Sequence, residues 1–120
     1  MGYRSVVLLA EDDHAGDGDG GSQEGFSRYS RLGFTLEVTG VTGAGSTLDV
    51  EILHSINDGV TWHQLAAFSQ TDGATPSTDS QFISVVLGVD PVFIGDAIMA
   101  RWNTTGSEVF TFGVYAAARS

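Results

Sequence analysis

Apolar and polar residues alternate along two neighbouring segments near the middle of the chain. In FTLEV, which starts at Phe34, and TLDVEI, which starts at Thr47, every second residue is apolar. This period of two is typical of a strand with one face on a core and the other in water. A Gly- and Thr-rich connection joins the two segments, and an Asn-Asp-Gly corner follows at 57–59. We therefore predict three strands joined as an antiparallel meander. Their ranges are 32–40, 47–55 and 60–69.

Strand patterns also occur toward both ends of the chain. We predict a first strand at 3–9, a strand with two apolar faces at 81–89, and a final hairpin formed by 97–103 and 108–117. In the last segment one face is apolar, comprising Phe110, Phe112, Val114 and Ala116. No run has the spacing of a helix. The sequence thus predicts an all-β protein of about seven strands, an antiparallel β-sandwich or jelly-roll-like fold.

The length of 120 residues is that of a single domain with one two-layer core. We expect three parts, an N-terminal arm or strand at 1–10, an acidic Gly-rich loop at 11–26, and the core of the sandwich at 32–118. Six carboxylates and five glycines precede Phe26 in the second part, and this composition favours a solvated loop. The apolar run at 3–10 is too short for a secretory signal or a transmembrane helix.

The chain is strongly acidic, with 15 Asp and Glu residues against five arginines and a formal net charge of −10. Such a surface repels nucleic-acid phosphates and anionic membranes, so we expect neither as a partner. The acidity is explained equally by a salty habitat and by solubility combined with a coding bias against lysine. Cysteine is absent, which excludes disulfides and Cys-based metal sites.

The segment Ser55–Trp62 resembles an Asp-box, the S-x-D-x-G-x-T-W hairpin of sialidase-type propellers and other secreted β proteins. Asn57 stands where the motif has aspartate. We expect Asn57 or Asp58 to cap the turn, Gly59 to adopt a positive φ, and Trp62 to fold back over the hairpin. In Asp-box proteins this turn is a folding device remote from the active site, so a structural role is predicted.

Two groups of side chains have the chemistry of cation ligands. His54 and His63 flank the turn and could bind zinc together with Asp49 or Glu51. Carboxylates of the acidic segment could bind a hard cation, although Arg28 stands where an EF-hand calcium loop needs glutamate. These carboxylates are Asp12, Asp13, Asp17, Asp19 and Glu24. We favour solvated surface residues in both cases and expect no metal and no cofactor.

The sequence shows no catalytic constellation. A G-x-S-x-G nucleophile elbow is absent. Glu37, Asp49 and Glu51 fall on the outward face of regular strands, as solvated residues do, although a carboxylate pair for glycoside hydrolysis stays an open alternative. We therefore expect no enzymatic activity and assign no catalytic residue.

Aromatic residues suggest a second class of function, carbohydrate binding, if they form an exposed platform. The candidates are Tyr3, Tyr29, Trp62, Trp102 and Tyr115. Of these, we assign Trp62 and Trp102 to the core.

The chain resembles a group of small virion proteins from tailed phages and related viruses. The resemblance covers most of 32–118, and the acidic segment departs from it. Near the C-terminus the shared pattern is a strand like IMARWNTTG followed by EVFTFGVYAAA. Its other motifs are Thr35–Gly43, Thr47–Ile52, Ser55–Trp62 and Leu65–Gln70.

This resemblance implies a non-enzymatic capsid decoration or cement subunit, often a homotrimer. Such a subunit is made in the host cytoplasm, binds the major capsid protein and lies on the outer surface of the virion. The alternatives are a carbohydrate-binding module and a tail or baseplate accessory protein.

We predict two contact surfaces for such a subunit. The N-terminal arm would dock to the shell, because a terminal segment can add a strand to a partner's sheet. Its residues are Tyr3, Arg4 and Val6. An apolar face would join the subunits to each other. Its residues are Met99, Val109 and Tyr115.

Overall fold

The computed structural model describes residues 2–42, 45–73, 79–86, 95–106 and 108–120. Nine strands lie in these ranges. They are β1 (Tyr3–His14), β2 (Asp17–Asp19), β3 (Arg31–Val41), β4 (Thr47–Ser55), β5 (His63–Ala67), β6 (Thr71–Asp72), β7 (Asp79–Val86), β8 (Ala97–Thr105) and β9 (Phe110–Arg119).

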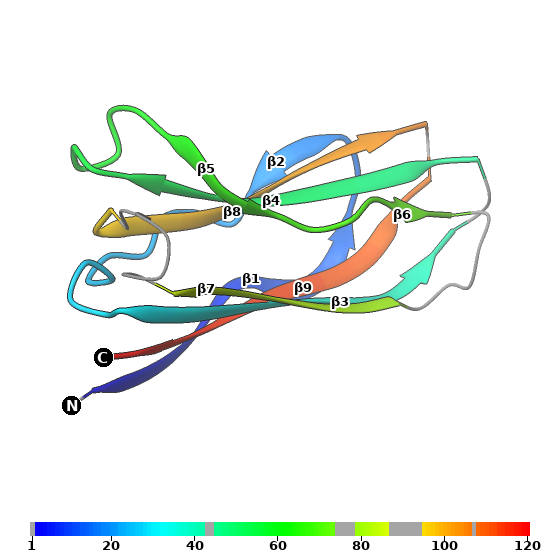
Figure 1. The fold of residues 1–120 in the computed structure, drawn as a ribbon. Coiled ribbons are helices and arrows are strands. Elements are labelled where there is room, and N and C mark those ends of the chain that lie inside the picture. Colours follow the sequence, from blue (N-terminus) through cyan, green and yellow to red (C-terminus); the bar gives the residue numbers. More distant parts are fainter. Residues whose placement is uncertain (1, 43–44, 74–78, 87–94, 107) are drawn as a thin grey trace.

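The strands form two antiparallel sheets that pack face to face (Figure 1). One sheet has the order β1-β9-β3-β7, and the other has the order β2-β8-β4-β5, with β6 paired to β4. The predicted all-β sandwich is therefore confirmed. The described strands exceed the predicted seven because of two short strands: β2 lies in the predicted acidic loop, and β6 lies outside every predicted strand range. The end of the strand predicted at 81–89 lies outside the described residues.

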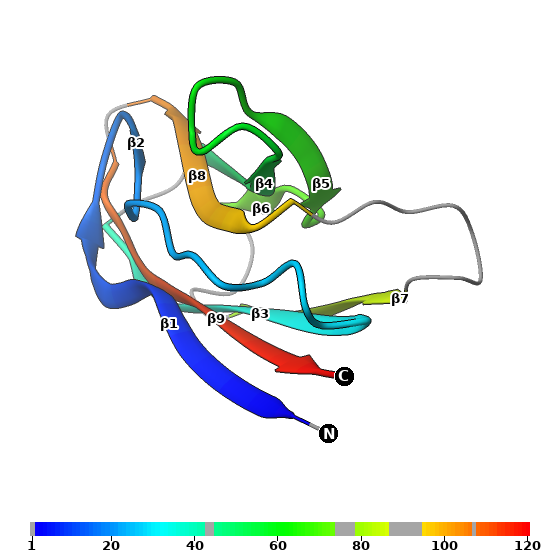
Figure 2. The same cartoon turned by 90° about the vertical axis from the view of Figure 1, so that its left-hand side faces the viewer.

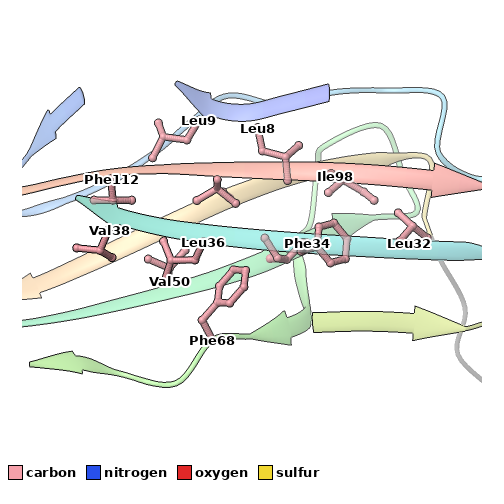
Figure 3. Close-up of a cluster of buried hydrophobic side chains, with 14 of the residues drawn as sticks. Leu8, Leu9, Leu32, Phe34, Leu36, Val38, Val50, Phe68, Ile98 and Phe112 are labelled. Carbon is pink, nitrogen blue, oxygen red and sulfur yellow. The ribbon is translucent and has the colours of Figure 1, made fainter. Parts of the chain in front are cut away.

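The core lies between the sheets and is formed by the apolar positions of the alternating patterns (Figure 3). Phe34 of β3, Ile52 of β4 and Phe112 of β9 are fully buried. The apolar face predicted for the last strand is confirmed, since its four residues are all buried. Burial of each large side chain contributes about 1.5–3 kcal/mol, and the sum over the core holds the two layers together.

The predicted meander is wrong at its first link. β3 pairs with β7 and β9, whereas β4 pairs with β8 and β5, so β3 and β4 lie in opposite sheets. The similar runs that begin at Thr35 and Thr47 face each other across the core instead of lying side by side. The second link is correct, because β4 and β5 pair directly, with His54 opposite His63.

The predicted final hairpin is also wrong. β8 pairs with β2 and β4, and β9 pairs with β1 and β3. The chain crosses from one sheet to the other after Gly106, whose φ is 87°. The crossing allows the apolar faces of both strands to meet in the core, where Ile98 and Phe112 are fully buried.

The acidic segment is not a loop along its whole length. β1 continues through Glu11 to His14 and pairs with β9 as far as His14 opposite Phe110. Asp17–Asp19 forms β2 and pairs with β8. Both are edge strands (Figure 2). Each pairs through its backbone with one neighbouring strand, while its carboxylate side chains are exposed to water. Acidic composition therefore did not prevent strand formation here.

Candidate interaction surfaces

The outer side of the four-stranded sheet carries exposed apolar and basic side chains. Three cross-strand rows run over it, each with one residue from β1, β9, β3 and β7 in that order. The rows are Tyr3-Arg119-Arg31-Val86, Ser5-Ala117-Gly33-Ser84 and Val7-Tyr115-Thr35-Phe82. Phe82 is 69% exposed and Tyr3 is 62% exposed. We call this surface the apolar–basic face.

A shallow groove of about 300 Å³ lies within the apolar–basic face. Phe82 and Val86 line it from β7, and Tyr3 lines it from β1. Gly33 forms part of its floor, where the absence of a side chain leaves room for the Phe82 ring. Exposed aromatic and aliphatic side chains grouped in this way are typical of a surface that contacts another molecule.

The groove of the apolar–basic face carries positive charge. Arg31 and Arg119 line the groove, and the Arg119 guanidinium lies 5.3 Å from the centroid of the Tyr3 ring. Carboxylates lie farther along the same outer side, where Glu37 accepts a hydrogen bond from Ser80 Oγ at 2.9 Å and Asp13 accepts one from Thr111 Oγ1 at 2.6 Å. The two arginines at the groove are therefore complementary to acidic groups elsewhere on a chain whose net charge is −10.

The predicted docking residues do not all lie on this face. Tyr3 is exposed on it, but Arg4 and Val6 alternate to the inner side of β1. Arg4 hydrogen-bonds the carbonyl oxygen of Glu24, and its guanidinium lies 4.5 Å from the Phe26 ring centroid. Val6 packs against the core. The N-terminal segment is moreover a paired strand from Tyr3 onward and not a free arm.

The predicted apolar contact face does not form one surface. Met99 lies in β8, opposite Leu53 of β4, and Tyr115 lies in β9 of the other sheet. Val109 lies just before β9, where its N–H donates to Thr42 Oγ1 at 2.9 Å. The prediction assumed that β8 and β9 were paired, and their separation into two sheets removes the common face. Tyr115 alone of the three lies on the apolar–basic face.

The turn at Ser55–Trp62 has the predicted structural role. Ser55 Oγ accepts hydrogen bonds from the N–H groups of Gly59, at 2.8 Å, and Asn57, at 3.3 Å. Asn57 Oδ1 in turn accepts from the N–H of Thr61 at 3.0 Å, so Asn57 caps the turn in place of the usual aspartate. Asp58 and Gly59 adopt positive φ values of 59° and 84°.

Two further features of this turn matter for its surface. The Trp62 ring folds back on Gly59, as predicted, so that an added Cβ there would lie 3.5 Å from the ring. Ile56 and Val60, by contrast, are 63% and 80% exposed. The turn is thus internally hydrogen-bonded and presents aliphatic side chains to solvent.

The two histidines of the hairpin do face each other, at His54 opposite His63. The pKa of His54 lies below its ordinary value because burial penalises the charged ring and because His63 repels it. His54 Nδ1 accepts a hydrogen bond from the N–H of Gly95 at 2.9 Å. Within the described ranges, no group of three or more His, Cys, Asp or Glu side chains is arranged to hold a metal ion.

A polar groove of about 540 Å³ lies on the outer side of the five-stranded sheet. Asn103 of β8 lies there between Asp17 of β2 and Asp49 of β4. In the next row, Arg101 forms an ion pair with Glu51. The sequence did not predict this groove, because β2 was expected to be part of a loop.

The aromatic platform that was considered as an alternative is not assembled. Tyr29 is buried, and Trp102 packs against the core with its ring centroid 4.6 Å from that of His14 and 5.9 Å from that of Phe112. Tyr3 and Tyr115 lie instead on the apolar–basic face of the other sheet. In the part of the chain that the structure describes, no helix has the length and apolar character to span a membrane.

The fold defines the class of protein as a two-sheet antiparallel β-sandwich that is jelly-roll-like. No protein-family model matches the chain, and no curated protein sequence matches it. Solved structures do match. A chain from the structure of the infectious bursal disease virus Gx strain is similar with a TM-score of 0.70 at 12% identity, over 97% of this chain and 31% of that one.

Two other structures of the same virus are also similar to this chain. The VP2 subviral particle of infectious bursal disease virus gives a TM-score of 0.66 at 12% identity over 98% of this chain. The T13 viral particle gives 0.64 at 14% identity over the same share. The chain spans about a third of the length of these proteins, 32% and 30% respectively. At this identity the likeness concerns the fold.

Proposed function

We propose that this protein is a structural subunit of a virus particle. The observation that carries the proposal is the similarity of nearly the whole chain to chains that form viral and subviral particles. The tailed-phage resemblance of the sequence supports the same class of function independently, because it rests on motifs and not on the fold. Both are analogies, and the surface of the molecule supplies the physical argument.

The apolar–basic face is the part of the molecule that suits this role. A subunit of a shell is held by contacts repeated over many copies, so each contact can be modest in size. An exposed sheet face with aromatic and aliphatic side chains and two arginines provides such a contact. In the more specific form of the proposal, the protein is a homotrimeric decoration or cement subunit that binds the major capsid protein on the outer surface.

The test is quantitative mass spectrometry of virus particles purified from cultures that express this sequence. A structural subunit is expected at a copy number in fixed proportion to the major capsid protein, through successive density gradients. Washing with high salt should release a decoration subunit while leaving the shell intact. Absence of the protein from purified particles would contradict the proposal.

The polar groove on the five-stranded sheet favours a second candidate function, carbohydrate binding. Asp17, Asn103 and Asp49 lie in one cross-strand row there and together offer acceptors and an amide donor for sugar hydroxyls. A glycan array with wild type and Asn103→Ala tests it. Binding that is lost in the variant supports this candidate, and no signal on the array for wild type contradicts it.

A further inference from the structure

We propose that the groove of the apolar–basic face binds the Ser55–Thr61 turn of a second copy of this chain. The inference deepens the proposed function, on which it rests, by naming the partner of that face. The contact would be head to tail, because the groove and the turn are different surfaces of one molecule.

Exposed apolar side chains supply the first argument. Six large hydrophobic residues are exposed in the described part of the chain. They are Tyr3, Val7, Ile56, Val60, Phe82 and Val86. Four of them lie on the apolar–basic face, and the other two lie on the turn. Contact between the face and the turn would therefore remove both exposed apolar patches from water at once.

Charge supplies the second argument. Asp58 is exposed at the turn, between Ile56 and Val60 in sequence. Arg31 and Arg119 line the groove. Insertion of the turn would place a carboxylate near two guanidinium groups, an arrangement that favours a defined orientation of the two copies.

The shape and rigidity of the turn supply the third. Hydrogen bonds from Gly59 and Asn57 to Ser55 Oγ, and from Thr61 to Asn57 Oδ1, hold the turn in one conformation. The groove lies on a regular sheet. Two preorganised surfaces lose little conformational entropy when they associate.

The arrangement of the layers requires two molecules for this contact. The turn extends from the five-stranded sheet (Figure 1). The groove is lined by residues on the outward side of the opposite sheet. A heterologous contact of this kind either closes into a ring or continues as a filament. A ring of three would agree with the homotrimer that the phage resemblance implies.

Sedimentation velocity of the full chain over a concentration series tests the inference. We expect species larger than the 12.6 kDa monomer. Asp58→Arg should weaken association at least about tenfold, and so should the double variant Arg31→Asp/Arg119→Asp. Combining both sets of changes reverses the charges on each side and should restore association.

Two further variants control for folding and for overall charge. Asp12→Arg makes the same change of charge at an exposed position of β1 and should leave association unchanged. Val60→Ser alters a side chain that is 80% exposed, so the fold should persist while association weakens. A wild-type monomer at all concentrations would overturn the inference, and so would failure of the combined variant to associate.

The same data separate this inference from the proposed function. A monomer that is nevertheless present in purified particles leaves the particle subunit standing and rejects the head-to-tail contact. An oligomer that has the predicted charge dependence but is absent from purified particles would support the head-to-tail contact and contradict the particle subunit.

Discussion

Phe82 of β7 covers the backbone of Gly33 in the paired strand β3. A Cβ added at Gly33 would lie 2.8 Å from Cε1 of the Phe82 ring, closer than side chains tolerate. Phe82 is 69% exposed, so its ring can swing toward solvent at small cost to the fold. The glycine therefore sets the position of the ring that lines the groove.

Gly33→Ala should accordingly reduce self-association more than it reduces stability. We expect a change of less than about 1 kcal/mol in the free energy of unfolding, measured by urea denaturation, because the displaced ring is already exposed. Sedimentation velocity should show weaker association. Gly40→Ala in the same strand is the matched control, because an added Cβ there would lie 3.7 Å from Thr111 Oγ1, an ordinary contact. Equal association of both variants and wild type would contradict the assigned role of Phe82.

Ser55→Ala should destabilise the protein through its turn. Ser55 is 1% exposed, and its hydroxyl accepts from the N–H groups of Gly59 and Asn57. Removing a buried acceptor leaves these donors without their partner and costs about 1–3 kcal/mol. Urea denaturation measures the change, and Ser22→Ala at an exposed position provides the control. A change of a few tenths of a kcal/mol would show that the turn does not depend on this hydroxyl.

Asp96→Asn should lower stability at neutral pH but not in acid. Hydrogen bonds from Ser27 and Gly25, with Arg28 nearby, hold the pKa of Asp96 below its ordinary value of 3.8. The folded state thus favours the charged carboxylate, and this stabilisation is present above the unfolded pKa and lost as pH falls through the folded pKa.

The measurement is the unfolding free energy of wild type and Asp96→Asn between pH 7 and pH 3. We expect a difference of less than about 1 kcal/mol, because water screens this solvent-accessible carboxylate, and the difference should stay constant down to about pH 5 and shrink below about pH 4. A difference that does not depend on pH would assign the effect to packing and not to the charge.

His54 should make stability fall in mild acid. Its pKa in the folded state lies below the ordinary value of 6.5, so the unfolded chain takes up the proton first. The free energy of unfolding should therefore decrease as pH falls from above 6.5 toward the folded pKa. Protonation of Nδ1 would also break the hydrogen bond from the N–H of Gly95.

Denaturation of wild type and His54→Asn at pH 7.5 and 5.5 measures this effect. The variant should lose less stability between the two pH values. His63→Gln should keep part of the effect, because burial of His54 contributes more to its lowered pKa than repulsion by His63 does. Identical pH dependence in wild type and His54→Asn would contradict the assignment.

Much of the candidate site could not be read from the sequence. The apolar–basic face combines residues from β1, β3, β7 and β9, which are far apart in the chain and meet only through strand pairing. Tyr3 and Tyr115 were singled out, and both lie on it, but Phe82 and Gly33 were not. The local turn at Ser55–Trp62 was predicted in detail, because its hydrogen bonds join residues within four positions of each other.

The sequence by itself determined where the long core strands lie and, for those with clear alternation such as 34–38, 47–52 and 110–116, which side is buried, because alternation along an extended backbone depends on nearest neighbours alone. It did not determine which strands pair. Phe34 and Val50 belong to strands with the same alternating pattern, and that pattern is satisfied equally by a hairpin and by two layers facing each other. In the folded protein the two strands lie in opposite sheets, because this arrangement buries both apolar faces in one core and leaves the acidic edge strands in water. Only the tertiary structure shows this choice.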